Sequence, residues 1–306
     1  MKKIAFILHG KITGKQQLMN EVYSVFNGDY DISFFTTEHP GHSVELSAKA
    51  TEQGFDYIIC VGEDGSVNEV ANGVMQAKSK SVGLDVKVGV LPHGTGNDFI
   101  KTVKSPQDCA GLKKLIDLDS FKEIDLGLVR FNNPQGVASS RYFINITDVG
   151  MGGVVAEKLS RFSKALGPSM TYQMAILSTL VSYRHQPIKV VADGFNFEGK
   201  VMNMIVANGK YFGSGMGVAP DAEVDDAKFS LVMVGEISLI DYIRHIGTIK
   251  KCKKIEHPQV SYKSATEITI DSLTAPQAID MDGEFIGYSP MHLKMVPKAI
   301  KFICPL

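Results

Sequence analysis

Hydrophobic and amphipathic segments alternate through the first part of the chain. The hydrophobic segments KIAFIL, DISFFTT, DYIICV and VKVGVLP predict strands, and the segments between them predict helices over about residues 15–26, 41–53, 66–78 and 106–117. Strands that alternate with helices indicate a parallel sheet covered by helices on both faces. We therefore expect residues 1–124 to form a doubly wound α/β domain.

The pattern changes after about residue 124, where strand-like segments crowd together. These segments lie at about 123–131, 141–147, 188–195, 199–209, 228–234, 266–272, 278–284, 292–296 and 299–303, with helical stretches at 152–183 and 237–250. The crowding predicts a mainly antiparallel β domain over residues 125–306. We expect residues 295–306 to pack back onto the first domain. Since no flexible linker separates the halves, an active-site cleft is expected between them.

The composition is that of an ordinary cytoplasmic protein. The formal net charge of −1 over 306 residues gives no global bias toward nucleic acid. The four cysteines are widely spaced, which suggests neither a zinc knuckle nor a disulfide framework. The apolar run after the two N-terminal lysines is too short for a secretory signal, and the uncharged stretch 168–183 is too short for a membrane span.

The segment CVGEDGSVNEVANG follows the third predicted strand and carries acids at a tight turn. Gly62 and Gly65 permit a close backbone approach, and the helix that follows offers free N–H groups to a phosphate. A carboxylate beside a phosphate requires a cation between them, so Asp64 is a candidate partner of a metal ion or its water. The alternative is a capping box, in which Ser66 and Glu69 merely start a helix.

A second glycine-rich turn, LPHGTGNDF, follows the next strand, where Thr95 to Asp98 would cap the next helix. Two such turns on successive strands of one sheet lie side by side, which favours a nucleotide site. The loop GKITGK resembles a Walker A loop but is one residue short, and Gln16 replaces the residue that would bind magnesium. We still expect this first loop to touch phosphate because of its position.

These motifs resemble the diacylglycerol kinase-like lipid kinase family, which includes bacterial diacylglycerol kinases and sphingosine kinases. The match runs in order through GEDGSVNEVANG, LPHGTGNDF, FINITDVGMGGVV, ANGKYFGSGMGVAPDAEVDD and MDGE, and so spans the chain. The resemblance implies an ATP- and Mg²⁺-dependent kinase that phosphorylates a lipid hydroxyl, diacylglycerol or a related lipid. It implies a partly membrane-associated protein at the inner face of the membrane, no nucleic-acid partner, and leaves a homodimer open.

The resemblance also implies roles for single residues. ATP would contact His9, Gly10, Thr37, Gly62, Glu63, Asp64, Gly65, Ser66, Val67, Asn68, Glu69, Gly94, Thr95 and Asn97. The acids needed for catalysis would be Asp64, Asp98, Asp125, Asp282 and Glu284. One of the last two would be the general base, and Asp282 is our first candidate, although the pair Asp-Gly is also that of a plain turn. A structural magnesium would be held by Asp226 with the carbonyl groups of Glu223 and Lys228.

Three residues depart from the family pattern. Ser66 replaces a threonine and keeps the hydroxyl, and His9-Gly10 replaces Asn-Pro. Glu63 replaces a glycine and places an extra anion beside the expected triphosphate, which opposes ATP binding unless it faces away or joins the metal shell. Two alternatives therefore stay open, a kinase for a soluble hydroxyl acceptor, as in NAD kinases, and a nucleotide-binding protein with weakened catalysis.

Residues 237–254 combine isoleucines with a set of basic side chains: Arg244, Lys250, Lys251, Lys253 and Lys254. Such a helix can dock on an anionic lipid surface. A solvated helix whose lysines favour the C-terminal end of the helix dipole explains the pattern equally well.

Overall fold

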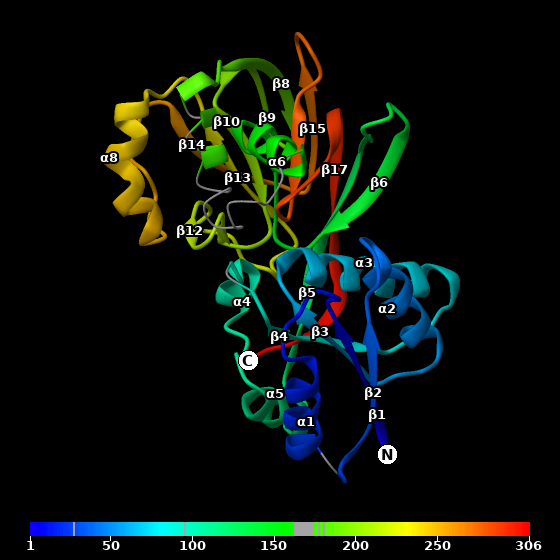
Figure 1. Cartoon of the computed structure of the whole chain (residues 1–306). Helices are drawn as coiled ribbons and strands as arrows, with labels where there is room; N and C mark the ends of the chain where they lie inside the picture. The colour runs from blue at the N-terminus through cyan, green and yellow to red at the C-terminus, as the bar shows by residue number, and fades with distance from the viewer. Residues whose placement is uncertain (27, 95, 162–173, 177, 180) are drawn as a thin grey trace. The chain divides into compact units, whose positions relative to one another are not determined.

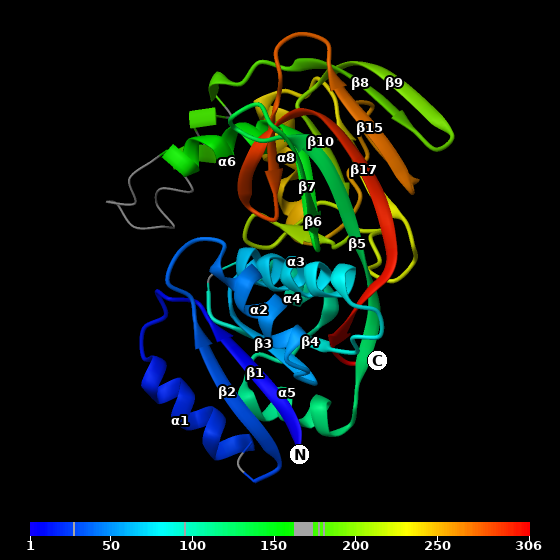
Figure 2. The ribbon, with the colours of Figure 1, turned by 90° about the vertical axis from the view of Figure 1, so that its right-hand side faces the viewer.

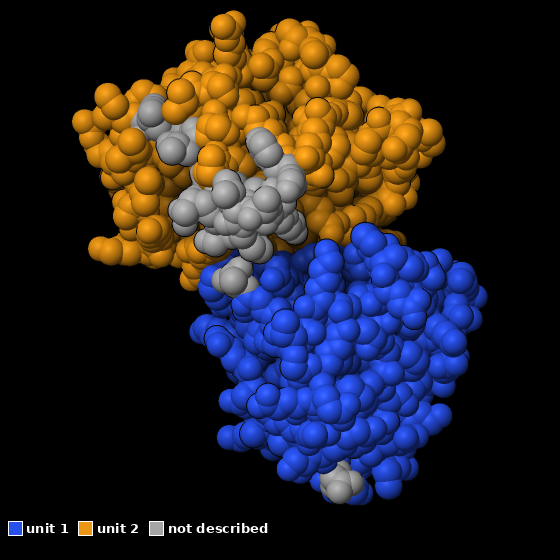
Figure 3. Space-filling view, in the orientation of Figure 1, with its two compact units in different colours: residues 1–126, 224–226, 296–306 blue, residues 127–223, 227–295 orange. Residues whose placement is uncertain are grey.

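The computed structural model describes the chain except for residues 27, 95, 162–173, 177 and 180. The chain divides into two compact units (Figures 1 and 3). Unit 1 comprises residues 1–126, 224–226 and 296–306, and unit 2 comprises residues 127–223 and 227–295. The sequence placed the boundary at residue 124, without the short segment 224–226.

Unit 1 is built on a parallel sheet. Its order is β2 (Tyr30–Thr36), β1 (Lys2–Leu8), β3 (Tyr57–Gly62), β4 (Lys87–Pro92) and the last residues of β17 (Glu284–Ile303). The C-terminal end of β17 pairs with β4, with Lys301 opposite Lys87. The strand β3 is buried along its whole length, as expected for a central strand with helices on both faces.

Helices cover both faces of this sheet (Figure 2). α1 (Lys15–Phe26) and α5 (Cys109–Asp117) pack on one face, around Phe6, Ile59 and other strand residues. α2 (His42–Glu52) and α3 (Asp64–Lys80) pack against one another and against the strands on the other face. The predicted doubly wound arrangement is confirmed.

The helix predicted at 106–117 is two helices, α4 (Asp98–Val103) and α5. α4 ends because Lys104 takes a left-handed conformation with φ of 54°, and Pro106 follows shortly afterwards. α5 then begins at its own cap, where the Asp108 carboxylate accepts the N–H of Gly111 at 2.7 Å.

Unit 2 is mainly antiparallel β structure, as the sequence predicts. One series of neighbours is β14 (Val260–Ala265), β13 (Phe229–Val234), β10 (Asn203–Ala207), β7 (Ile146–Gly150), β16 (Ala278–Met281) and β17. The others are β5 (Phe121–Asn132), β6 (Ala138–Phe143), β8 (Gln186–Ala192), β9 (Phe195–Val201) and β15 (Glu267–Ser272), with the small pair β11 (Tyr211–Phe212) and β12 (Met216–Gly217). The polar strand β14 is not evident in the sequence.

The core of unit 2 lies between these strands and includes Phe143, Met204 and Phe229. Two long helices accompany the strands, α6 (Met151–Arg161) and α8 (Leu239–Lys250). Much of the predicted helix at 152–183 beyond α6 lies outside the described residues. Among the helices that the structure describes, none has the length and apolar character needed to cross a membrane.

Candidate functional site

Four strands of unit 1 end at the same edge of the sheet, and short contacts join each end to the next. After β1, the Gly10 N–H donates to Thr37 Oγ1 at 2.8 Å, beyond the end of β2. The His9 N–H donates to the last turn of β3 at 3.1 Å, and the His93 N–H donates to the Gly62 carbonyl at 3.0 Å. Residues that are far apart in the sequence thus form one continuous edge.

Glycine allows the backbone and side chains to approach closely at this edge. A Cβ on Gly62 would lie 2.7 Å from Ser66 Oγ, so the serine hydroxyl folds back over the end of β3. A Cβ on Gly10 would lie 2.2 Å from the Thr37 carbonyl oxygen. Any larger residue at either position would push the turn open.

Helix α3 begins at this edge, with Glu63 as its N-cap residue, and no side chain caps it. The interpretation of Ser66 as the N-cap of a capping box is therefore wrong, because Ser66 lies inside the first turn. A helix N-terminus without a capping side chain keeps its first N–H groups and its positive dipole end for an external anion.

The Asp64 carboxylate joins the two predicted turns. It accepts the N–H of Asp98 at 2.9 Å and the N–H of Phe99 at 3.0 Å, and so caps α4 from the neighbouring turn. The prediction that residues 95–98 supply this cap is wrong, since Asn97 makes no side-chain cap. Burial raises the pKa of Asp64, and the two N–H donors oppose that rise.

Asp98 lies beside Asp64 and is almost fully buried. Its carboxylate forms an ion pair of 2.8 Å with Lys101, which also donates to the Gly96 carbonyl. The Asn97 side chain donates to the Gly94 carbonyl at 2.9 Å and holds the loop. Thr95, the predicted ATP contact between them, lies outside the described residues.

Glu63 is exposed and reaches the second turn. A Cβ on Gly94 would lie 2.0 Å from Glu63 Cγ and 2.6 Å from its Oε1, so the Glu63 side chain lies against Gly94. The extra carboxylate therefore stays at the edge and does not turn away from it.

Glu69 lies one turn further along α3 and anchors the loop after β2. Its two oxygens accept the N–H groups of Gly41 at 3.1 Å and Ser43 at 3.3 Å, at the start of α2. Val67 and Asn68 are fully buried. These three predicted ATP contacts thus hold the scaffold behind the edge.

Asp125 lies in β5 and is fully buried. Its carboxylate accepts the N–H of Lys298 at 2.7 Å, and its own N–H donates to the Val224 carbonyl at 2.7 Å. All three segments belong to unit 1. The contacts give Asp125 a part in holding this unit together.

Asp282 forms the tip of the β16–β17 hairpin in unit 2. Asp282 and Gly283 both have positive φ, 49° and 85°, which matches a two-residue type I′ turn between Met281 and Glu284. The Asp282 carboxylate also accepts three backbone N–H groups at 2.8–3.1 Å, those of Ile144, Asn145 and Ile146. The D-G pair is both a turn and a buried anchor.

Glu284 follows the turn and points to a different partner. Its side chain is 42% exposed and forms an ion pair of 2.8 Å with Arg141 on β6. Arg141 was not predicted from the sequence, because its pairing depends on the meeting of two distant strands.

Two further acids in unit 2 face one another across β7 and β16. Asp148 is opposite Asp280, and both side chains are buried. Asp148 Oδ2 and Asp280 Oδ1 have no hydrogen-bond partner within the described part of the chain. Burial raises the pKa of Asp148 to about 7. Burial and then the neighbouring Asp148 raise the pKa of Asp280.

Comparison with known proteins places this geometry in a family. The family model "Diacylglycerol kinase catalytic domain" matches residues 3–129. The model "YegS C-terminal NAD kinase beta sandwich-like domain" matches residues 145–304, more than half of the chain. The chain belongs to the diacylglycerol kinase-like lipid kinase family. By family it is a phosphotransferase that acts on an alcohol group.

Curated relatives agree along their whole length. A diacylglycerol kinase of Staphylococcus haemolyticus (strain JCSC1435) is 28% identical over 311 aligned positions, which cover 100% of this chain and 89% of the relative. A diacylglycerol kinase of Staphylococcus aureus (strain bovine RF122 / ET3-1) is also 28% identical, with 93% of that protein covered.

Solved structures of Bacillus anthracis str. Sterne proteins share the fold of this family member. A candidate diacylglycerol kinase matches with a TM-score of 0.80 at 22% identity, over 99% of this chain and 95% of that one. A diacylglycerol kinase matches with a TM-score of 0.72 at 20% identity, over 99% and 97% of the two chains.

The magnesium ligands that the family resemblance implies lie where the chain leaves unit 2 for unit 1 and returns. Glu223 and Lys228 belong to unit 2, and Asp226 belongs to unit 1. The adjacent Asp225 pairs with Lys122 at 3.3 Å. The structural magnesium stays a prediction.

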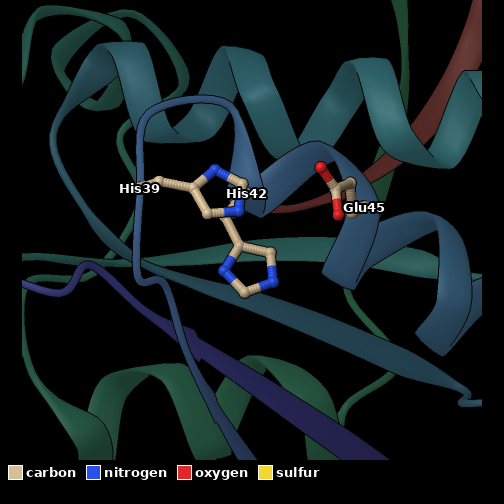
Figure 4. A group of neighbouring side chains, drawn as sticks. All are labelled: His39, His42 and Glu45. Atoms are coloured by element: carbon tan, nitrogen blue, oxygen red, sulfur yellow. The ribbon is translucent and has the colours of Figure 1, made fainter.

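One group of three metal-type side chains occurs among the described residues, His39, His42 and Glu45 (Figure 4). The two imidazole rings are stacked, with centroids 4.5 Å apart and planes 8° from parallel. Lone pairs in parallel ring planes do not converge on one point. His42 Nδ1 also accepts the Glu38 N–H at 3.1 Å. The group orders the loop after Thr37 and is not arranged as a metal centre.

Lys15 is a residue of the edge that no motif singled out. Its Nζ donates to the Gly10 carbonyl at 2.6 Å, which brings a cation to the end of β1. The failed Walker A pattern contains this lysine, so its position in the first loop was the available signal.

Proposed function

We propose that this chain is an ATP- and Mg²⁺-dependent lipid kinase that transfers the γ-phosphate of ATP to the hydroxyl of diacylglycerol or a related lipid. The observation that carries the proposal is the uncapped N-terminus of α3 at a glycine-lined strand edge. Such an edge binds phosphate through backbone N–H groups. The names of the staphylococcal relatives support a lipid acceptor.

Unit 1 would hold ATP. The first N–H groups of α3 and the Ser66 hydroxyl would contact its phosphates, with Lys15 and the turn at Gly94 on either side. Oxygen donors suited to magnesium are present, because Asp64 and Asp98 lie together and each carboxylate has lone pairs beyond those engaged by N–H groups. A bound Mg²⁺ would neutralise phosphate charge during transfer.

Unit 2 would supply the proton acceptor. The lipid hydroxyl oxygen bonds to the γ-phosphorus as the bond to the β–γ bridging oxygen breaks, and the hydroxyl proton must leave. Asp282 already accepts three N–H groups, which makes it a weak proton acceptor. Glu284 is partly exposed and joined only to Arg141 by a printed ion pair, so we assign it the role of base. Asp282 then positions the hairpin.

Incubation with labelled ATP, Mg²⁺ and a panel of dispersed lipids tests the proposal. We expect label in a lipid product and none without Mg²⁺. Label in NAD or another soluble acceptor would favour the soluble-acceptor kinase. ATP binding without transfer to any acceptor would favour the nucleotide-binding protein.

A further inference from the structure

Helix α8 has two distinct faces in unit 2. Tyr242, His245, Ile246 and Ile249 recur at intervals of three and four residues and are shielded, with Ile249 buried. The Tyr242 hydroxyl reaches Met216 Sδ at 3.9 Å, so this face packs toward β12. The helix begins at a capping box formed by Ser238 and Asp241, which fixes its start.

The opposite face is exposed and contains the wrong side chains for a solvated surface. Ile240 is 66% exposed and Ile243 is 58% exposed. They lie three residues apart, so they are neighbours on the helix surface. Since the packed face is complete without them, the core of unit 2 does not account for these two isoleucines.

Basic residues continue the exposed face toward the end of the helix. Arg244, Lys250 and Lys251 fall on the same stripe, and Lys253 and Lys254 follow it. Residues 239–254 hold these five cations and a single acid, Asp241, so the segment carries a net charge of +4 in a chain of net −1.

Few of these charges are neutralised within the protein. Arg244 pairs with Asp241 at 3.4 Å, and Lys254 pairs with Asp221 at 2.5 Å. Lys250, Lys251 and Lys253 have no ion-pair partner among the residues that the structure describes. An apolar stripe beside unpaired cations matches the interface of an anionic bilayer, where isoleucine enters the headgroup boundary and lysine meets lipid phosphate.

We propose that the exposed face of α8, formed by Ile240, Ile243, Arg244, Lys250 and Lys251, docks this protein on an anionic lipid surface. The proposal rests on the proposed function only in its purpose, which is to bring unit 2 to a membrane-borne acceptor. The charge of the face selects the occupant, because a zwitterionic surface or an apolar protein groove gives the lysines no partner.

Co-sedimentation with vesicles tests the docking face without ATP or turnover. The parental protein is expected to bind vesicles containing phosphatidylglycerol and not vesicles of phosphatidylcholine alone, and added salt should release it. Ile240→Ser with Ile243→Ser should weaken binding at least tenfold. Lys250→Gln with Lys251→Gln should do the same, since each basic residue near the surface contributes about fivefold.

Matched variants elsewhere control for apolar area and charge. Val82→Ser removes an exposed apolar side chain in unit 1, and Lys189→Gln with Lys200→Gln removes the same charge from β8 and β9. These controls should bind as the parent does, and melting temperatures should show that all variants are folded. Equal binding of the α8 variants and the controls would overturn the proposal.

Two further readings separate the explanations. Activity on a lipid dispersed in detergent micelles should survive the α8 substitutions while activity on vesicles falls. If no lipid is phosphorylated but vesicle binding still depends on α8, the proposed function fails and the docking face stands. If Ile240→Ser with Ile243→Ser converts a dimer to a monomer, the face is a self-association surface and the proposal is wrong.

Discussion

The strand edge of unit 1 and the β16–β17 hairpin of unit 2 both hold an aspartate by backbone N–H groups, yet their surroundings differ in charge. Around Asp64 lie the open N-terminus of α3, Lys101 and Lys15. Near Asp282 lie other acids, Glu284, Asp280 and Asp148. The first setting suits a polyanion and the second suits proton transfer from a hydroxyl. Phosphate binding and proton acceptance are thus divided between the two regions.

The largest expected effect distinguishes the two acids of the hairpin. Glu284→Gln should lower the transfer rate by about 10²–10⁴-fold, the usual loss for a general base, with an unchanged melting temperature. Asp282→Asn should lower both the rate and the melting temperature, because it takes an acceptor from three buried N–H groups. Steady-state kinetics and thermal melts check both variants. Near-parental turnover of Glu284→Gln at saturating substrate would return the base role to Asp282.

The next effect concerns the buried pair beside the hairpin. The folded-state pKa of Asp148, about 7, lies above the value for an unfolded chain. Between about pH 4 and pH 7 the folded protein therefore keeps a proton that the unfolded chain has lost, so stability falls as pH rises through this window. Asp148→Asn removes that cost and should stabilise the protein at pH 8 by about 1–4 kcal/mol, and less at pH 5.

Urea unfolding of Asp148→Asn at both pH values makes the measurement, with the exposed Asp31→Asn as control. A gain that is equal at both pH values would show that the charge of Asp148 is not the cause. Lower stability of Asp148→Asn at pH 8 would show that the carboxylate is held ionised.

A smaller effect tests whether Asp64 is more than a cap. Asp64→Ala leaves the N–H groups of Asp98 and Phe99 without their acceptor and should cost about 1–3 kcal/mol of stability. It should also weaken the magnesium dependence of ATP binding. Asp108→Ala removes the cap of α5 and is the matched control, with a cost of about 1 kcal/mol and no change in ATP binding. Unchanged magnesium dependence in Asp64→Ala would leave a purely structural residue.

The smallest effect concerns Glu63 at the strand edge of unit 1. Its carboxylate lies against Gly94 and should repel a triphosphate, so Glu63→Gly is expected to tighten ATP binding by several-fold, about 1 kcal/mol. Glu63→Gln keeps the size and should give much of the same gain. Calorimetry at low and high salt should show a gain that shrinks with salt. Weaker binding by both variants would mean that Glu63 ligates the cation.

Sequence reasoning found what depends on local pattern and parallel topology. The glycine turns after β3 and β4 were predicted together because parallel strands end at one edge. The capping of α4 by Asp64 and of α2 by Glu69 was missed, because each joins a helix start to an acid from another helix. The pair of Asp148 and Asp280 was missed as well, since it exists only through the register of β7 on β16. Long-range contacts of this kind leave no spacing signal in one sequence.

The most direct test of phosphate binding at the α3 turn is a map of backbone amides on addition of ATP and Mg²⁺. NMR of the labelled protein should show the largest shifts at the N–H groups of Gly65 and Ser66, with smaller shifts at Gly94. The amides of Asp108 and Gly111, at the capped start of α5, should not move. Shifts confined to other residues, or none at the α3 turn at saturating ATP, would contradict the account.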